Sequence, residues 1–213
     1  MVSQTYSQRQ GFTLIEMIVS LGIFSIVVTT AVGAMLILIS TNRQLQSEQS
    51  VMTNLSFALD TMTREIRTGY NYYCANDASS PSGFFTGNGH EDIGPDVQDC
   101  PSGRGNTSQQ GVSFYEGGNS LTGATTNRVL YYFDNNTKSL YRRLGNGSPQ
   151  SIVSSGLSII DAQFYVTGAY SVGAVPANYE QPTVTIYLAA QDANDASRTY
   201  YLQTTVTQRI LDI

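Results

Sequence analysis

The sequence predicts an α+β fold in which one long N-terminal helix packs on a mainly antiparallel β-sheet. Two observations predict it. Residues 13–68 contain no proline and pass from an apolar run to an amphipathic pattern with helical spacing, and the chain after Gly111 consists of short β-rich runs separated by polar turns. Strands that follow a helix, without alternating with further helices, are typical of an antiparallel sheet. The length of 213 residues suits one domain plus an appendage.

The first part of the predicted helix has the composition of a membrane span. Residues 12–39 are apolar apart from Ser, Thr, two glycines and one acid, Glu16, and residues 17–39 carry no charge. At about 1.5 Å per residue, a helix of this length crosses a hydrocarbon core of about 30 Å. Arg9 precedes the span and Arg43 follows it, so the positive-inside rule orients the span only weakly. The short basic leader favours a cytoplasmic N-terminus.

The apolar run does not end as a secretory signal peptide does. Such a signal is cut after its apolar run, at small residues. Here the run continues into a polar helical pattern without a break of that kind. We therefore expect a cut before the run, which keeps the anchor on the chain.

The residues at the head of the run resemble a known processing motif. The segment Gly11-Phe12-Thr13-Leu14-Ile15-Glu16 is similar to the prepilin cleavage and methylation motif of type IV pilins and type II secretion pseudopilins. The resemblance implies a pilin-like fold, cleavage by prepilin peptidase between Gly11 and Phe12, and N-methylation of Phe12. It also implies a leader over residues 1–11, a transmembrane and filament-core helix over 12–39, and an extracytoplasmic globular domain over 40–213.

Partners and location follow from the same resemblance. The expected partners are prepilin peptidase, other pilin or pseudopilin subunits, an inner-membrane assembly platform and membrane lipid. The expected location is the inner membrane, crossed once with the C-terminal domain outside the cytoplasm, and then a pilus or pseudopilus. The resemblance implies a protein that assembles and is not an enzyme, with no catalytic residue, metal or cofactor.

Glu16 is the one ionisable residue of the predicted span. An ionisable side chain inside a membrane segment is costly and usually has a partner. The partner that the resemblance implies is the amine of a neighbouring subunit's first residue, and this pairing would remove two charges from lipid and set the axial register. The alternative is a glutamate that snorkels to the membrane interface near the helix start.

The helix pattern becomes amphipathic after Ile39. Apolar residues at spacings of seven, three, four, three and four form one stripe, which we expect to pack on the sheet: Leu45, Met52, Leu55, Leu59, Met62 and Ile66. Gly69, just after Arg64 and Arg67, is a plausible C-cap.

The rest of the chain divides into a loop and a series of strands. Residues 70–110 have the composition of a long loop. We expect strands over 112–115, 128–133, 139–144, 157–166, 183–190 and 199–210, with turns at 134–137 and 191–198.

The cysteines and acids of the loop raise two further questions. Cys74 and Cys100 flank its central part, and a disulfide is the pairing that fits an exported chain. The alternative is two free thiols in a reducing compartment. Five acids, Asp77, Glu91, Asp92, Asp96 and Asp99, suggest calcium, but their spacing matches no EF-hand loop, so we expect a solvated loop and no metal.

Composition weighs against enzymatic and nucleic-acid functions. His90 is the only histidine, and the chain has neither a Gly-x-Ser-x-Gly elbow nor a P-loop. The net charge is −5 and Lys138 is the only lysine, so no nucleic-acid partner is expected. A competence-type pilin that takes part in DNA uptake remains as the alternative, with Arg142 and Arg143 beside Tyr141 as its best basic-aromatic group.

Two weaker motifs resemble the minor pseudopilin J and PilW-like group. One is the predicted helix end, Leu59-Asp60-Thr61-Met62-Thr63-Arg64-Glu65-Ile66-Arg67, and the other is the strand motif Leu140-Tyr141-Arg142-Arg143. The resemblance therefore implies a minor subunit at or near the tip of a type IV pilus or a type II secretion pseudopilus. A major, fibre-building pilin is a further possibility, although major pilins tend to be shorter and to close their C-terminal region with a disulfide.

Overall fold

A computed structural model describes residues 11–74, 97–100, 110–117, 128–145, 147–169 and 180–209 of the chain. Within these residues it contains one helix and eight strands: α1 (Leu14–Thr68), β1 (Tyr70–Cys74), β2 (Gly111–Tyr115), β3 (Arg128–Asp134), β4 (Ser139–Leu144), β5 (Gln150–Ser151), β6 (Leu157–Thr167), β7 (Thr183–Asp192) and β8 (Tyr200–Thr207).

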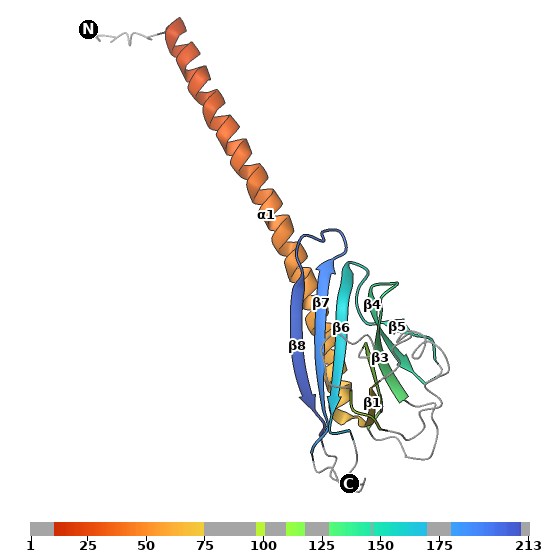
Figure 1. Ribbon diagram of the computed structural model, residues 1–213. Coiled ribbons are helices and arrows are strands. Elements are labelled where there is room, and N and C mark those ends of the chain that lie inside the picture. Colours follow the sequence, from red (N-terminus) through yellow and green to blue (C-terminus); the bar gives the residue numbers. More distant parts are fainter. Residues whose placement is uncertain are drawn as a thin grey trace, which may run out of the picture. The chain divides into compact units, whose positions relative to one another are not determined.

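The strands form two antiparallel sheets where one was expected. The first has the order β1-β2-β3-β4-β5 and the second has the order β6-β7-β8. Figure 1 shows β6, β7 and β8 side by side. Every neighbouring pair in both sheets is antiparallel. The α+β prediction of a long helix packed on antiparallel strands is confirmed. The six predicted strands all form, with the bounds of 139–144 unchanged and those of the other five differing by up to three residues.

The chain divides into two compact units, residues 1–47 and residues 48–213. The part of α1 in the first unit is a single helix that makes no packed core, and its large apolar side chains are exposed along the whole run from Leu14 to Ile39. Exposed apolar surface on this scale is unfavourable in water, so this segment requires another environment.

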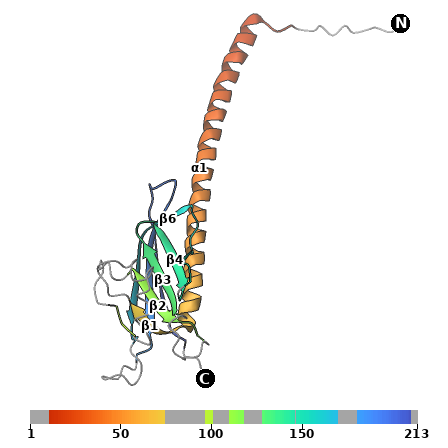
Figure 2. The same cartoon turned by 90° about the vertical axis from the view of Figure 1, so that its right-hand side faces the viewer.

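In the second unit, the C-terminal part of α1 supplies one face of the core. Figure 2 shows it running along one face of the strands. Its buried residues are Val51, Leu55, Ala58, Leu59, Met62 and Ile66. They join buried side chains of both sheets, such as Phe114, Tyr131, Phe164 and Ile186, in one hydrophobic cluster.

The predicted apolar stripe was wrong at two of its six positions. Leu45 is 50% exposed and Met52 is 43% exposed, whereas Val51 and Ala58 are buried. Leu45 precedes the part of the helix that packs on strands. The helix face centred on Leu55, Met62 and Ile66 turns Val51 and Ala58 inward, since residues three and four apart share a face.

The end of α1 differs from the predicted glycine cap. Gly69 does not adopt the left-handed backbone that a C-cap glycine uses. The last carbonyls of the helix are satisfied otherwise: the Tyr72 hydroxyl lies 2.5 Å from the Ile66 oxygen, and the Arg209 N–H donates to the Arg67 oxygen at 2.7 Å. Gly69 is needed for space, because a Cβ there would lie 2.4 Å from the Phe114 ring.

The expected loop over residues 70–110 begins as strand β1. Tyr70 pairs with Tyr115 and Cys74 with Val112 of β2, and Asn71 at the intervening bulge has a φ of 54°. The sequence Tyr-Asn-Tyr-Tyr-Cys is rich in strand-forming tyrosine, and this signal was obscured by the polar residues that follow. His90 and the acids Asp77, Glu91, Asp92 and Asp96 lie outside the described residues.

Residues 97–100 form a strap between the two sheets. On one side, the Cys74 N–H donates to the Gln98 oxygen and the Gln98 N–H donates to the Tyr72 oxygen of β1, each at 3.0 Å. On the other side, the Cys100 N–H donates to the Val166 oxygen of β6 at 3.0 Å. The backbone of this short segment therefore bridges β1 and β6, which belong to different sheets.

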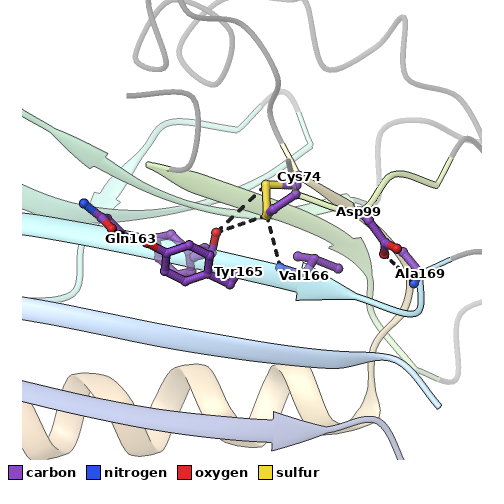
Figure 3. The surroundings of a disulfide bond; sticks show 8 residues. Cys74, Asp99, Gln163, Tyr165, Val166 and Ala169 are labelled. Atoms are coloured by element: carbon purple, nitrogen blue, oxygen red, sulfur yellow. Dashed lines mark hydrogen bonds between the residues drawn. A yellow bond between two sulfur atoms is a disulfide. The ribbon is translucent and has the colours of Figure 1, made fainter. Parts of the chain in front are cut away.

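A disulfide between Cys74 and Cys100 closes this strap. The two Cα atoms are 5.1 Å apart, and the Cys74 side chain is fully buried. Figure 3 shows the pair against β6, where the Val166 N–H donates to the Cys100 Sγ at 3.1 Å. The pairing expected for an exported chain is thus present in the structure, and the alternative of two free thiols is not.

A charged cluster ties the end of α1 to the first sheet. The Arg142 Nε of β4 donates to the Glu65 carboxylate at 2.9 Å, and the Tyr131 hydroxyl of β3 donates to the same Glu65 Oε2 at 2.8 Å. Burial, together with the Glu65 charge beside it, raises the pKa of Tyr131 well above its usual range. Tyr131 therefore stays neutral and remains a donor to Glu65.

Replacing Gly69 with Ala should destabilise the second unit. The new methyl group would overlap the ring of Phe114, which is fully buried in the core. Overpacking of this kind costs about 1–3 kcal/mol. Urea denaturation of the detergent-solubilised chain measures the loss. Gly156→Ala is the matched control, since its Cβ would meet only Ser154, at 4.0 Å; equal stability of the two variants would contradict the prediction.

Removing the disulfide should loosen the strap and lower stability. The cysteines are separated by 26 residues, and a loop of this size contributes about 3–4 kcal/mol on the chain-entropy model. We expect a Cys74→Ala/Cys100→Ala double variant to lose free energy of unfolding on this scale. A non-reducing peptide map of the wild-type chain should show the two peptides linked; both cysteines alkylated without prior reduction would count against the bond.

Candidate processing and assembly site at the start of helix α1

Thr13 caps the N-terminus of α1. The helix begins at Leu14, and the Glu16 N–H donates to the Thr13 Oγ1 at 3.4 Å. A threonine N-cap followed three residues later by glutamate has the sequence of a capping box, which satisfies N–H groups that have no partner inside the helix. This role was not predicted from the sequence, although the pattern Thr13-x-x-Glu16 was its signal.

Gly11 and Phe12 precede the helix and are fully accessible. Phe12 is 80% exposed. A Cβ on Gly11 would meet no atom within 4 Å, so the fold of the isolated chain does not require glycine at this position. If glycine is required here, the requirement arises in another molecule that handles this segment.

Glu16 lies in the first turn of α1 among exposed apolar side chains. Its neighbours Ile15 and Met17 are 69% and 62% exposed. A carboxylate in the first turn interacts favourably with the positive end of the helix dipole. Within the part of the chain that the structure describes, the Glu16 side chain forms no ion pair.

The hydroxyl groups of the apolar segment are satisfied inside the helix. Ser25 donates to the Leu21 oxygen at 2.8 Å, and Thr29 donates to the Ser25 oxygen at 2.8 Å. Ser20, Thr30, Ser40 and Thr41 form bonds of the same kind. Such bonds to the preceding turn let hydroxyls lie in an apolar environment without unmet polar groups. An ionised Glu16 carboxylate cannot form such a bond, because it has no hydrogen to donate to a carbonyl of the preceding turn.

One helix of the described chain, α1, is long and apolar enough to cross a membrane. The qualifying stretch is near the N-terminus and none of it is buried within the fold. A core helix of a water-soluble domain would be buried, so the exposure distinguishes this segment from that case.

No metal centre is formed by the described residues, since no three His, Cys, Asp or Glu side chains converge there. Asp99, the one acid of the expected loop that is described, accepts a hydrogen bond from the Ala169 N–H at 2.8 Å (Figure 3). Its role is to hold the strap against the end of β6.

Comparison with known proteins gives a match at this site. The family model for the prokaryotic N-terminal methylation motif matches residues 6–32, which include Gly11, Phe12 and Glu16. No curated protein and no solved structure matches the chain. From Gly11 on, the matched residues comprise the exposed residues before α1, its capped start and the exposed apolar turns that follow. The chain therefore carries, at the head of its long helix, the signature of type IV pilins and pseudopilins.

Proposed function

We propose that the protein is a minor pilin or pseudopilin subunit. In this proposal, prepilin peptidase cuts between Gly11 and Phe12 and Phe12 is N-methylated. The mature chain then leaves the inner membrane through an assembly platform and joins other subunits in a type IV pilus or a type II secretion pseudopilus. One observation carries the proposal: the methylation motif lies at the head of the exposed apolar segment of α1, residues 14–39, in which Glu16 is the one ionisable residue.

The proposal also assigns a role to Glu16. Assembly would place the carboxylate beside the amine of a neighbour's Phe12, so that both charges leave the lipid together. The exposed apolar surface of α1 would be covered by lipid before assembly and by neighbouring helices after it. Both environments suit a helix whose hydroxyls are already satisfied internally.

A position at or near the tip rests on the two weaker motifs. In the structure these motifs meet: Glu65 of the helix-end motif pairs with Arg142 of the strand motif at 2.9 Å. The two motifs therefore share one structural contact in this fold, between the helix end and β4.

An extracytoplasmic location of the second unit is supported by the disulfide. Disulfides form and persist in oxidising compartments outside the cytoplasm. The bond lies in the second unit, residues 48–213, which would then lie on the outer side of the membrane with the leader on the inner side.

No structural observation favours the competence alternative. The competence alternative depended on Arg142 and Arg143 beside Tyr141, and these side chains make contacts within the fold. Arg142 pairs with Glu65, and Arg143 is only 6% exposed and donates to the Gly147 oxygen at 2.9 Å. Tyr141 stacks on Tyr132 with the ring centroids 5.5 Å apart. A phosphate-binding surface needs accessible cations, so this group is poorly placed for DNA.

The processing step is tested by the N-terminus of the mature protein. We expect the chain recovered from its native membrane to begin at Phe12 and to carry one methyl group on its amine. Intact-mass and N-terminal peptide mass spectrometry measure both. A start at any residue after Ile39 would remove the membrane anchor and, with it, the proposed function.

The proposed role of Glu16 is tested by a variant that removes the charge of its side chain while keeping a residue that can complete the capping box. Glu16→Gln keeps a residue that suits a capping box and removes the charge. We expect cleavage, membrane insertion and the fold of the second unit to persist, while incorporation into the filament falls. Removing one partner of a buried ion pair costs about 3–5 kcal/mol, because the amine is left buried alone.

The control for this experiment is Thr13→Ala, which removes the cap and keeps the carboxylate. Loss of an N-cap costs only about 0.5–2 kcal/mol. Incorporation is measured as the fraction of the chain that co-purifies with filaments. If Glu16→Gln is incorporated at the normal level, or if Thr13→Ala is equally defective, Glu16 is not the register contact proposed.

A further inference from the structure

The two cysteines of the disulfide are held in the fold in different ways. Cys74 is the last residue of β1, its side chain is fully buried, and it pairs with Val112 of β2. It belongs to the hydrophobic core cluster, whereas Cys100 is only partly buried against that cluster. Cys100 also lies outside the eight strands. The first sheet therefore holds Cys74, and the disulfide links it to a residue that no strand holds.

Cys100 is positioned by the strap, residues 97–100. In the described part of the chain, the strap is held mainly by hydrogen bonds: those of Gln98 to β1 and of Cys100 to β6, at 3.0 Å each, and one from the Ala169 N–H to the Asp99 carboxylate at 2.8 Å. Val97 packs against the core but is only partly buried. A segment that buries little apolar surface opens at a lower free energy than the core strands of the same unit.

The strap also joins the two sheets through a series of hydrogen bonds. Gln98 forms a parallel bridge with Tyr73 of β1. On the other side, the Cys100 N–H donates to the Val166 oxygen of β6 at 3.0 Å, and the Val166 N–H donates to the Cys100 Sγ at 3.1 Å (Figure 3). These backbone groups of β1 and β6 lose their partners when the strap leaves. The hydrogen-bonded join between the sheets therefore depends on the closed strap.

We propose that the strap is the last part of the second unit to close, and that Cys100 is the cysteine that reacts with the oxidant. The oxidant is a disulfide-bearing exchange protein outside the cytoplasm, so this inference rests on the location proposed above for the second unit. A thiol reacts only where the oxidant reaches it. An open strap presents Cys100 to the solvent, whereas Cys74 stays in β1 and completes the bond from there.

The proposed reaction consists of two thiol–disulfide exchanges. The Cys100 thiolate attacks one sulfur of the oxidant's disulfide, a mixed disulfide forms, and the other sulfur of the oxidant leaves as a thiolate. The Cys74 thiolate then attacks the Cys100 Sγ, the mixed disulfide breaks, and the second sulfur of the oxidant leaves. The chain loses two electrons and two protons, and the oxidant gains the two electrons as it becomes a dithiol.

Backbone amide exchange tests the order of closure in the full-length chain in detergent. After reduction and removal of the reductant, without oxygen, the amides of Gln98 and Cys100 should exchange at least about tenfold faster than in the oxidised chain. Amides of the central strand β7, such as that of Ile186, should exchange at the same rate in both forms. Unchanged strap amides after reduction would overturn the proposal, and so would equal acceleration of the β7 amides, because the strap would then not open separately.

Two single-cysteine variants test which residue reacts. Cys74→Ala leaves only Cys100, and Cys100→Ala leaves only Cys74. With oxidised glutathione as the probe, we expect the folded Cys74→Ala chain to form its mixed disulfide at least about tenfold faster, because Cys74 remains in a buried strand. In urea, where both thiols are exposed, the two rates should agree within about twofold. Mass spectrometry of the intact chain measures both rates.

Equal rates in the two folded variants, or a faster reaction of Cys74, would show that Cys100 is not the entry point. A tenfold difference that persists in urea would also overturn the proposal, because the local sequence and not the fold would then set the rates. None of these measurements requires a filament. A chain that gives the expected rates but is never found in a pilus or pseudopilus overturns the proposed function alone.

Discussion

Burial of one face of α1 against both sheets is the interaction on which the rest of the structure depends. Leu55, Met62 and Ile66 are fully buried, and they belong to the same cluster as Phe114 of the first sheet and Phe164 of the second. Each sheet by itself would expose an apolar face, and the helix gives both a common core. The same helix carries the apolar segment of residues 14–39, which has no core of its own. One element therefore serves two environments along its length.

The contacts at the end of α1 and at the strap supply directional specificity that apolar burial lacks. Hydrophobic burial is not directional, so it does not by itself select how a helix end and two sheets are joined. Glu65 supplies a directional contact through Arg142 and Tyr131, and the strap supplies another through the backbone of Gln98 and Cys100. These polar contacts lie in the second unit and join residues of two separate sequence motifs, at the helix end and on β4.

The start of α1 combines two features in a single sequence motif. Thr13 caps the helix, and Glu16 places a carboxylate among exposed apolar side chains. The serine and threonine hydroxyls that follow are satisfied by carbonyls of the preceding turn, whereas a carboxylate has no hydrogen to donate to a carbonyl. A partner for this carboxylate would come from outside the helix. For this reason we propose Glu16 as the contact between subunits.

The sequence by itself determined the features that depend on local pattern: the long helix, the apolar segment with Glu16, the methylation motif at Gly11 and Phe12, and the six main strands. These follow from helical and strand periodicity and from residues that adjoin one another in the chain. Only the tertiary structure decided the second sheet, the true buried face with Val51 and Ala58, the reason for Gly69 and the strap through residues 97–100. Each of these depends on atoms that come from distant parts of the chain, such as Phe114 against Gly69 and Val166 against Cys100. The spacing of apolar residues along the chain predicts which residues are buried. Which residues they contact is decided by how the helix and the strands pack in three dimensions.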